Sequence, residues 1–148
     1  MNPKRLILAI AAVFVFVWVT DFLIHHVWLM GDYNATASLW RPATEMGPHL
    51  GWLFLGELLW SVTFVILYAK GFAAMNCLRC ACLYGLFMGL FFEANTLVAY
   101  FSQPLPGELA LKWFVANVAR AVLAGVIVFL AYKPKPGDGR SDGCEPKK

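Results

Sequence analysis

Residues 6–30 read LILAIAAVFVFVWVTDFLIHHVWLM, a nearly unbroken apolar run. About 20 such residues cross roughly 30 Å of hydrocarbon when they form an α-helix that rises about 1.5 Å per residue. The run is longer than the core of a secretory signal, and it ends in Asp21, His25 and His26 rather than at a small-residue cleavage site. We therefore expect a first transmembrane helix that is retained.

Three further segments have the same character, so the predicted membrane-spanning helices are 6–30, 50–69, 81–102 and 109–132. With 60% hydrophobic and 14% charged residues, the composition differs clearly from that of a water-soluble domain. The expected fold class is all-α: a polytopic membrane protein built as a four-transmembrane-helix bundle, forming one domain over residues 1–132. Residues 133–148 are rich in Lys, Pro and Gly, and we expect them to form a disordered cytoplasmic tail.

The basic residues predict the orientation of this bundle. Nine of the 12 lie on one side of the predicted helices, in the first five residues, in the loop between the second and third segments, and in the tail. Because lysine and arginine are enriched in cytoplasmic loops, both termini are expected to be cytoplasmic and residues 31–49 external. The same bias accounts for the net charge of +3, so no nucleic-acid partner is implied.

Each predicted helix carries one ionisable residue at a similar depth: Asp21, Glu57, Glu93 and Arg120. A charged side chain facing lipid would be costly, so these residues should face the interior of the bundle. Arg120 can neutralise one acid, which we take to be Glu57. The remaining carboxylates must then take up a proton, hold a cation or contact water.

His25 lies one helical turn from Asp21, which could orient its imidazole as a proton acceptor or ligand. The predicted ligand- or proton-binding residues are therefore Asp21, His25, Glu57, Glu93, Asn117 and Arg120. The alternative is a purely structural layer, in which one acid pairs with Arg120, the others stay protonated, and the network only determines how the helices assemble.

The external residues 31–49 mix aromatic and small polar side chains, which favours a short interfacial helix or folded cap. Such a cap could act as a lid over the charged layer, or its aromatic side chains could simply form an interfacial belt. His49 lies near the mouth of the layer.

Metal binding would have to use His25, His49 or the thiols of Cys77, Cys80 and Cys82. The cytoplasm keeps thiols reduced, so structural disulfides are not expected on that side. Three cysteines without a histidine are a weak zinc pattern, however, and small thiols at the start of a helix often serve only as packing residues.

The Trp-rich first helix, the external aromatic segment, Leu105-Pro106, Trp113-Phe114 and the final Tyr132-Lys133-Pro134 resemble small uncharacterised four-helix membrane proteins of bacteria. This resemblance implies the fold and a bacterial inner-membrane location, and it implies no activity.

These observations favour a non-enzymatic bundle that binds a proton, a cation or a small solute at the charged layer. The alternatives are a membrane redox enzyme or subunit in which imidazoles and acids hold a metal or haem, and an accessory subunit of a larger membrane complex. The sequence identifies no cofactor. The expected partners are the lipid bilayer and either further copies of the chain, as a homo-oligomer, or a larger complex.

Overall fold

The computed structural model describes residues 2–132, and within this range the chain is helical and contains no strand. Its α-helices are α1 (Pro3–Phe22), α2 (Met30–Ala35), α3 (Ala43–Met46), α4 (Leu50–Gly71), α5 (Leu78–Ser102) and α6 (Gly107–Ala131). A π-helical turn, η1 (Leu23–Trp28), follows α1, and short 3₁₀ turns occur at η2 (Ala37–Leu39), η3 (Gly47–His49) and η4 (Ala73–Met75). The predicted tail, 133–148, lies outside the described residues.

Four helical stretches are long and apolar enough to cross a membrane, which confirms that part of the prediction. They are Pro3–Trp28, Ala37–Gly71, Leu78–Ser102 and Gly107–Ala131. Local chemistry explains where the first of them begins. The Asn2 side chain accepts a hydrogen bond from the Arg5 amide at 3.4 Å, and Pro3 occupies the first helical turn, where its missing N–H costs nothing.

Two glycine-lined helices form the closest contact in the bundle. A Cβ atom built on Gly85 of α5 would lie 2.4 Å from the Ala121 carbonyl oxygen of α6, and one on Gly125 would lie 2.4 Å from the Ala81 oxygen. Only glycine allows the two backbones to approach so closely. The α5–α6 hairpin is therefore the most tightly packed unit, and α6 also packs against α1.

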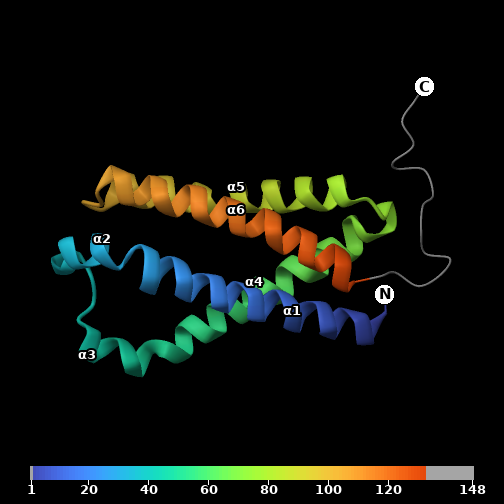
Figure 1. The fold of residues 1–148 in the computed structure, drawn as a ribbon, viewed down its shortest axis with the longest axis horizontal. Helices are drawn as coiled ribbons and strands as arrows, with labels where there is room; N and C mark the ends of the chain where they lie inside the picture. Colours follow the sequence, from blue (N-terminus) through green and yellow to red (C-terminus); the bar gives the residue numbers. More distant parts are fainter. Residues whose placement is uncertain (1, 133–148) are drawn as a thin grey trace.

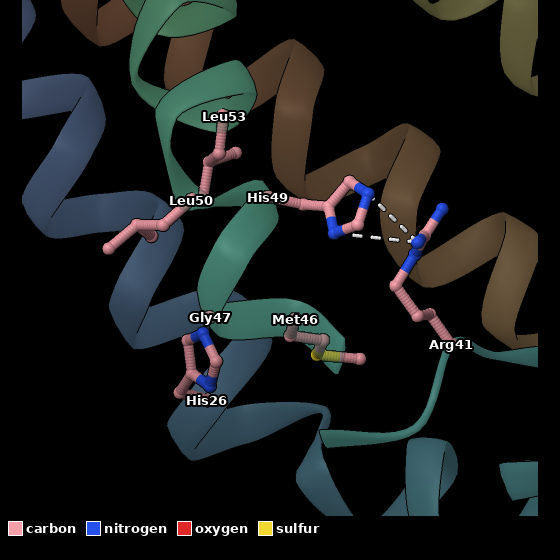
Figure 2. A pocket seen from close by; sticks show the side chains of 7 residues that line it. All are labelled: His26, Arg41, Met46, Gly47, His49, Leu50 and Leu53. Atoms are coloured by element: carbon pink, nitrogen blue, oxygen red, sulfur yellow. Dashed lines mark hydrogen bonds between the residues drawn. The ribbon is translucent and has the colours of Figure 1, made fainter. Parts of the chain in front are cut away.

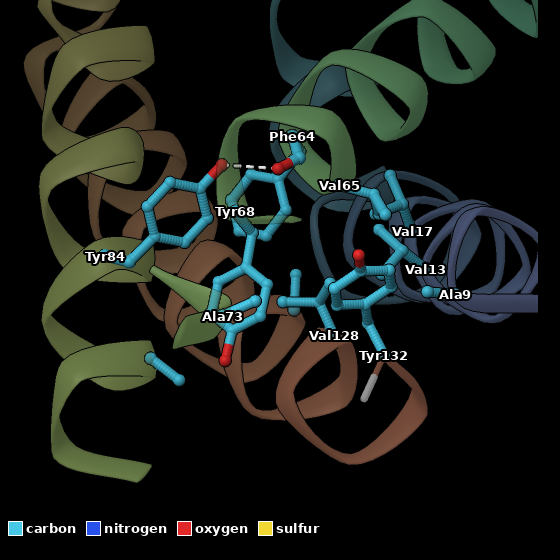
Figure 3. Close-up of a cluster of buried hydrophobic side chains, with 12 residues drawn as sticks. Ala9, Val13, Val17, Phe64, Val65, Tyr68, Ala73, Tyr84, Val128 and Tyr132 are labelled. Atoms are coloured by element: carbon cyan, nitrogen blue, oxygen red, sulfur yellow. Dashed lines mark hydrogen bonds between the residues drawn. The ribbon is translucent and has the colours of Figure 1, made fainter. Parts of the chain in front are cut away.

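Packing is concentrated toward the end of the bundle that holds the N-terminus and the end of α6 (Figure 1). Val13 and Val17 of α1 share one buried cluster with Phe64, Val65 and Tyr68 of α4, and the Tyr84 hydroxyl of α5 donates to the Phe64 carbonyl oxygen at 2.5 Å (Figure 3). Toward α3 the helix α4 diverges from the others, and its first residues, 50–56, are exposed. The bundle is thus closed at one end and open at the other, where α2 and α3 lie.

Candidate functional site

An ion pair joins the first and last long helices in the open half of the bundle. Arg120 Nη1 of α6 donates to Asp21 Oδ1 of α1 at 2.8 Å, and the two side chains are only 14% and 17% exposed. The arginine therefore neutralises Asp21, whereas the sequence interpretation had assigned it to Glu57. The physical reason is that α6 packs directly along α1, so the residues at equal depth on these two helices meet.

The π-helical turn η1 follows immediately and contains His25, whose Nε2 lies 3.4 Å from Asp21 Oδ1. A π turn inserts one extra residue into an α-helix and is found frequently at functional sites. The structure shows the expected juxtaposition of Asp21 and His25, but no sequence pattern indicated that His25 would lie in a π-helical turn.

On its other side, His25 contacts α2, which belongs to the segment 31–49. His25 Nδ1 lies 2.5 Å from the hydroxyl of Tyr33 in α2, and the Trp113 indole Nε1 of α6 donates to the same hydroxyl at 2.8 Å. An indole N–H can only donate, so the Tyr33 oxygen accepts from Trp113 and its proton is free to point at His25. The neutral imidazole then carries its own proton on Nε2, the nitrogen that lies 3.4 Å from Asp21 Oδ1.

Tyr33 keeps its proton under ordinary conditions. Burial raises the pKa of the Tyr33 hydroxyl to about 12, because the phenolate would lose hydration. The resulting series Arg120, Asp21, His25, Tyr33 and Trp113 is continuous, and we call it the relay. It runs from the interior of the bundle to residues 31–49, which we call the cap.

The cap is held over the relay by further contacts to α6. Lys112 Nζ lies 3.1 Å from both carboxylate oxygens of Asp32, and 2.7 Å from Glu108 Oε1. The Trp40 indole donates to Thr36 Oγ1 at 2.8 Å. Its ring lies against Tyr33 and Trp113, with centroid distances of 5.3 and 5.7 Å. Residues 31–49 therefore fold as short helices, and the α2 part is anchored by an ion pair and an aromatic cluster.

The two other acids differ in their surroundings. Glu57 of α4 is partly buried and interacts electrostatically with Arg120 and Asp21. Within residues 2–132 no hydrogen bond or ion pair joins it to another side chain. Glu93 of α5 is 8% exposed and accepts a hydrogen bond from the Thr96 hydroxyl at 2.6 Å, so it is satisfied within its own helix.

Asn117 lies one turn before Arg120 on α6, and its side-chain oxygen is buried without a hydrogen-bond partner in the described part of the chain. Ser61, one turn after Glu57 on α4, has an equally buried and unpartnered hydroxyl. Buried polar atoms normally find partners. These two orphaned atoms mark the bundle interior as a place where polar contacts are incomplete.

The metal candidates do not assemble into a site. Across residues 2–132 no group of three or more His, Cys, Asp or Glu side chains is placed to hold a metal ion. His49 contacts Arg41 and the Glu45 carbonyl oxygen. At the start of α5, the Cys80 amide donates to Cys77 Sγ at 3.4 Å, and Cys80 and Cys82 are free thiols. Cys77 is disulfide-bonded, contrary to the expectation of reduced thiols.

Sequence reasoning did not include Tyr33, Trp113, Asp32 or Lys112 in the site. One usable signal existed, because Trp113, Asn117 and Arg120 recur at three- and four-residue steps and so share a face of α6. The contact between α2 and α6 spans 80 positions in sequence, and no local pattern indicates it.

Comparison of the chain with models of known protein families, with curated proteins and with solved structures found no match in any of the three.

Proposed function

We propose that the protein is an integral membrane protein whose bundle binds and releases a proton at the relay. The observation that carries this proposal is the continuous contact series from Arg120 through Asp21 and His25 to Tyr33. Histidine changes charge near neutral pH, and a neighbouring carboxylate orients its ring. His25 is the proton-binding group, Asp21 positions it, and Arg120 pairs with Asp21.

The charges around His25 support this role. Asp21 and Glu57 bring two negative charges close to the single positive charge of Arg120, so one negative charge is in excess when all three are ionised. A proton on His25 or Glu57, or a small cation between them, restores neutrality in a region where uncompensated charge is costly.

Protonation of His25 changes the hydrogen bonds between His25 and the cap. Once both ring nitrogens carry protons, Nδ1 becomes a donor, so the Tyr33 hydroxyl must turn its own proton away and accept from both His25 and Trp113. The contact between η1, α2 and α6 then changes its hydrogen-bond pattern. The proton on His25 is thereby coupled to the external cap.

We further propose that residues 31–49 face the external side of a bacterial inner membrane and that both termini are cytoplasmic. The N-terminus and the end of α6 lie at the same end of the bundle, opposite to α2 and α3 (Figure 1). Lys4, Arg5, Lys70 and Arg79 belong to that end, which supports this orientation.

The test relies on the fact that the chain contains only three histidines. Tryptophan fluorescence of the purified protein in neutral detergent would be followed from about pH 5 to pH 8, where histidine titrates. Trp113 lies 6.3 Å from the His25 ring, so its emission should change as His25 is protonated. We expect one titration step in the wild type and in His49→Gln, and none in His25→Gln. A step that survives in His25→Gln would refute the proposal.

A further inference from the structure

A cavity of about 430 Å³ opens at the end of the molecule that holds α2 and α3, between η1 and the start of α4 (Figure 2). It is separate from the relay, since none of the relay residues lines it. Its lining combines three basic side chains, His26, Arg41 and His49, with the apolar Met46, Leu50 and Leu53. The volume is in the usual range of about 300–1,000 Å³ for small-molecule sites.

Hydrogen bonding shows how charge is distributed in this cavity. His49 Nδ1 lies 2.9 Å from the Glu45 carbonyl oxygen and must donate to it, so the neutral ring accepts at Nε2 from Arg41 Nη1, 3.0 Å away (Figure 2). The acid closest to Arg41 is Glu45, and its carboxylate is 4.0 Å away with both side chains about half exposed or more, at 49% and 62%. An exposed pair at that distance neutralises little. Arg41 therefore presents a positive charge, with guanidinium donors left for a ligand.

Another part of the cavity wall is apolar. Leu50 and Leu53 are 55% and 44% exposed, because α4 diverges from α1 before its first residues can pack. A small inorganic anion would satisfy Arg41 and leave this wall uncovered. An amphiphile with an anionic head and a hydrocarbon chain would satisfy both surfaces.

We propose that this cavity binds an anionic phospholipid, with its phosphate at Arg41 and an acyl chain against Leu50 and Leu53. Arginine matches phosphate oxygens with two parallel N–H donors. The inference rests on membrane insertion, proposed above, and it is independent of the relay because it involves neither Asp21 nor His25. If His25 does not bind a proton, the lipid-binding proposal is therefore unaffected.

The experiment measures thermal unfolding of the full chain in an uncharged detergent while one additive is titrated. The additives are phosphatidylglycerol, phosphatidylcholine with the same acyl chains, and glycerol phosphate without chains. We expect phosphatidylglycerol to raise the melting temperature of the wild type, and the other two to have little effect. Arg41→Gln should weaken the apparent affinity for phosphatidylglycerol about tenfold or more, as expected for losing a charge-assisted hydrogen bond.

Two variants complete the test. Arg79→Gln removes an exposed arginine at the opposite end of the bundle and should respond like the wild type. Leu53→Gln should weaken lipid binding without removing charge, and it also tests the site if Arg41→Gln does not fold. Equal effects of the two lipids, an equal effect of glycerol phosphate, or an unchanged response in both Arg41→Gln and Leu53→Gln would each overturn the proposal.

Discussion

Tyr33 is the cap residue that contacts both His25 and Trp113. Removing its hydroxyl leaves the Trp113 N–H without an acceptor and His25 Nδ1 without a donor. Because each newly unsatisfied buried group costs about 1–3 kcal/mol, we expect Tyr33→Phe to lower the free energy of unfolding by an amount of this order. Chemical unfolding in micelles measures it, with Tyr100→Phe, on the exposed part of α5, as the matched control.

The same hydroxyl gives a direct test of its burial. An ordinary tyrosine ionises near pH 10, but the pKa of Tyr33 is raised to about 12 by burial. Because folding raises this pKa, the stability contributed by keeping Tyr33 protonated is fully present below pH 10 and is lost as the pH rises through 12. The difference in phenolate absorbance between wild type and Tyr33→Phe should therefore have its midpoint near pH 12. A midpoint near pH 10 would mean that Tyr33 is hydrated.

The pairing of Arg120 also has a measurable consequence. Arg120→Leu removes one partner of a mostly buried ion pair and leaves Asp21 and Glu57 uncompensated, so it should cost about 3–5 kcal/mol of folding free energy. Glu57→Gln removes an acid that has no close partner in the described chain, and it should be tolerated or slightly stabilising. Unfolding measurements that give equal, small effects for both variants would mean that Arg120 reaches solvent instead.

The sequence predictions placed Asp21, His25 and Arg120 at one site, and the structure brings these three side chains together, but it pairs Arg120 with Asp21 rather than with Glu57. Asp21, His25 and Arg120 could be found because charged residues within apolar helices are uncommon and face inward. The choice between Asp21 and Glu57 could not be made, since both acids have the same depth. It depends on which helix lies beside α6, and that is a property of the whole bundle.

At the scale of elements, the α5–α6 contact is the closest helix–helix approach in the bundle. Gly85→Ala would place a methyl group 2.4 Å from the Ala121 backbone oxygen, so the two helices would have to separate, at about 1–3 kcal/mol. Gly56→Ala is the matched control: it lies within α4, has nothing within 4 Å, and should be neutral or stabilising by up to about 1 kcal/mol. Thermal unfolding of the two variants compares them directly. Similar melting temperatures would contradict the close approach.

The elements also show where hydrophobic periodicity succeeds and where it fails. The four apolar segments predicted the four long helices because length and apolar composition alone determine what can cross a bilayer. The π turn at Leu23–Trp28 was not predictable, because the prediction used the length and apolar composition of each segment, and a π turn alters neither. The attachment of α2 to α6 was missed because Asp32 and Lys112 pair across a long stretch of chain.

For the whole molecule, the proposed orientation places the cap and both basic ends on opposite sides of the membrane. Ser38 lies in the exposed 3₁₀ turn η2, so a single cysteine at that position should be accessible from the external solution. In intact cells we expect Ser38→Cys to react with a membrane-impermeant maleimide, and tags at either terminus to be protected from external protease until the cells are opened.

Because Cys77, Cys80, Cys82 and Cys144 also carry sulfur, each is first replaced by serine, and the cysteine-free chain is the control. The basic residues at the end that holds the N-terminus favour this arrangement by the free-energy cost of translocating them. A protected position 38 together with digested tags would reverse the orientation, and the relay would then open toward the cytoplasm.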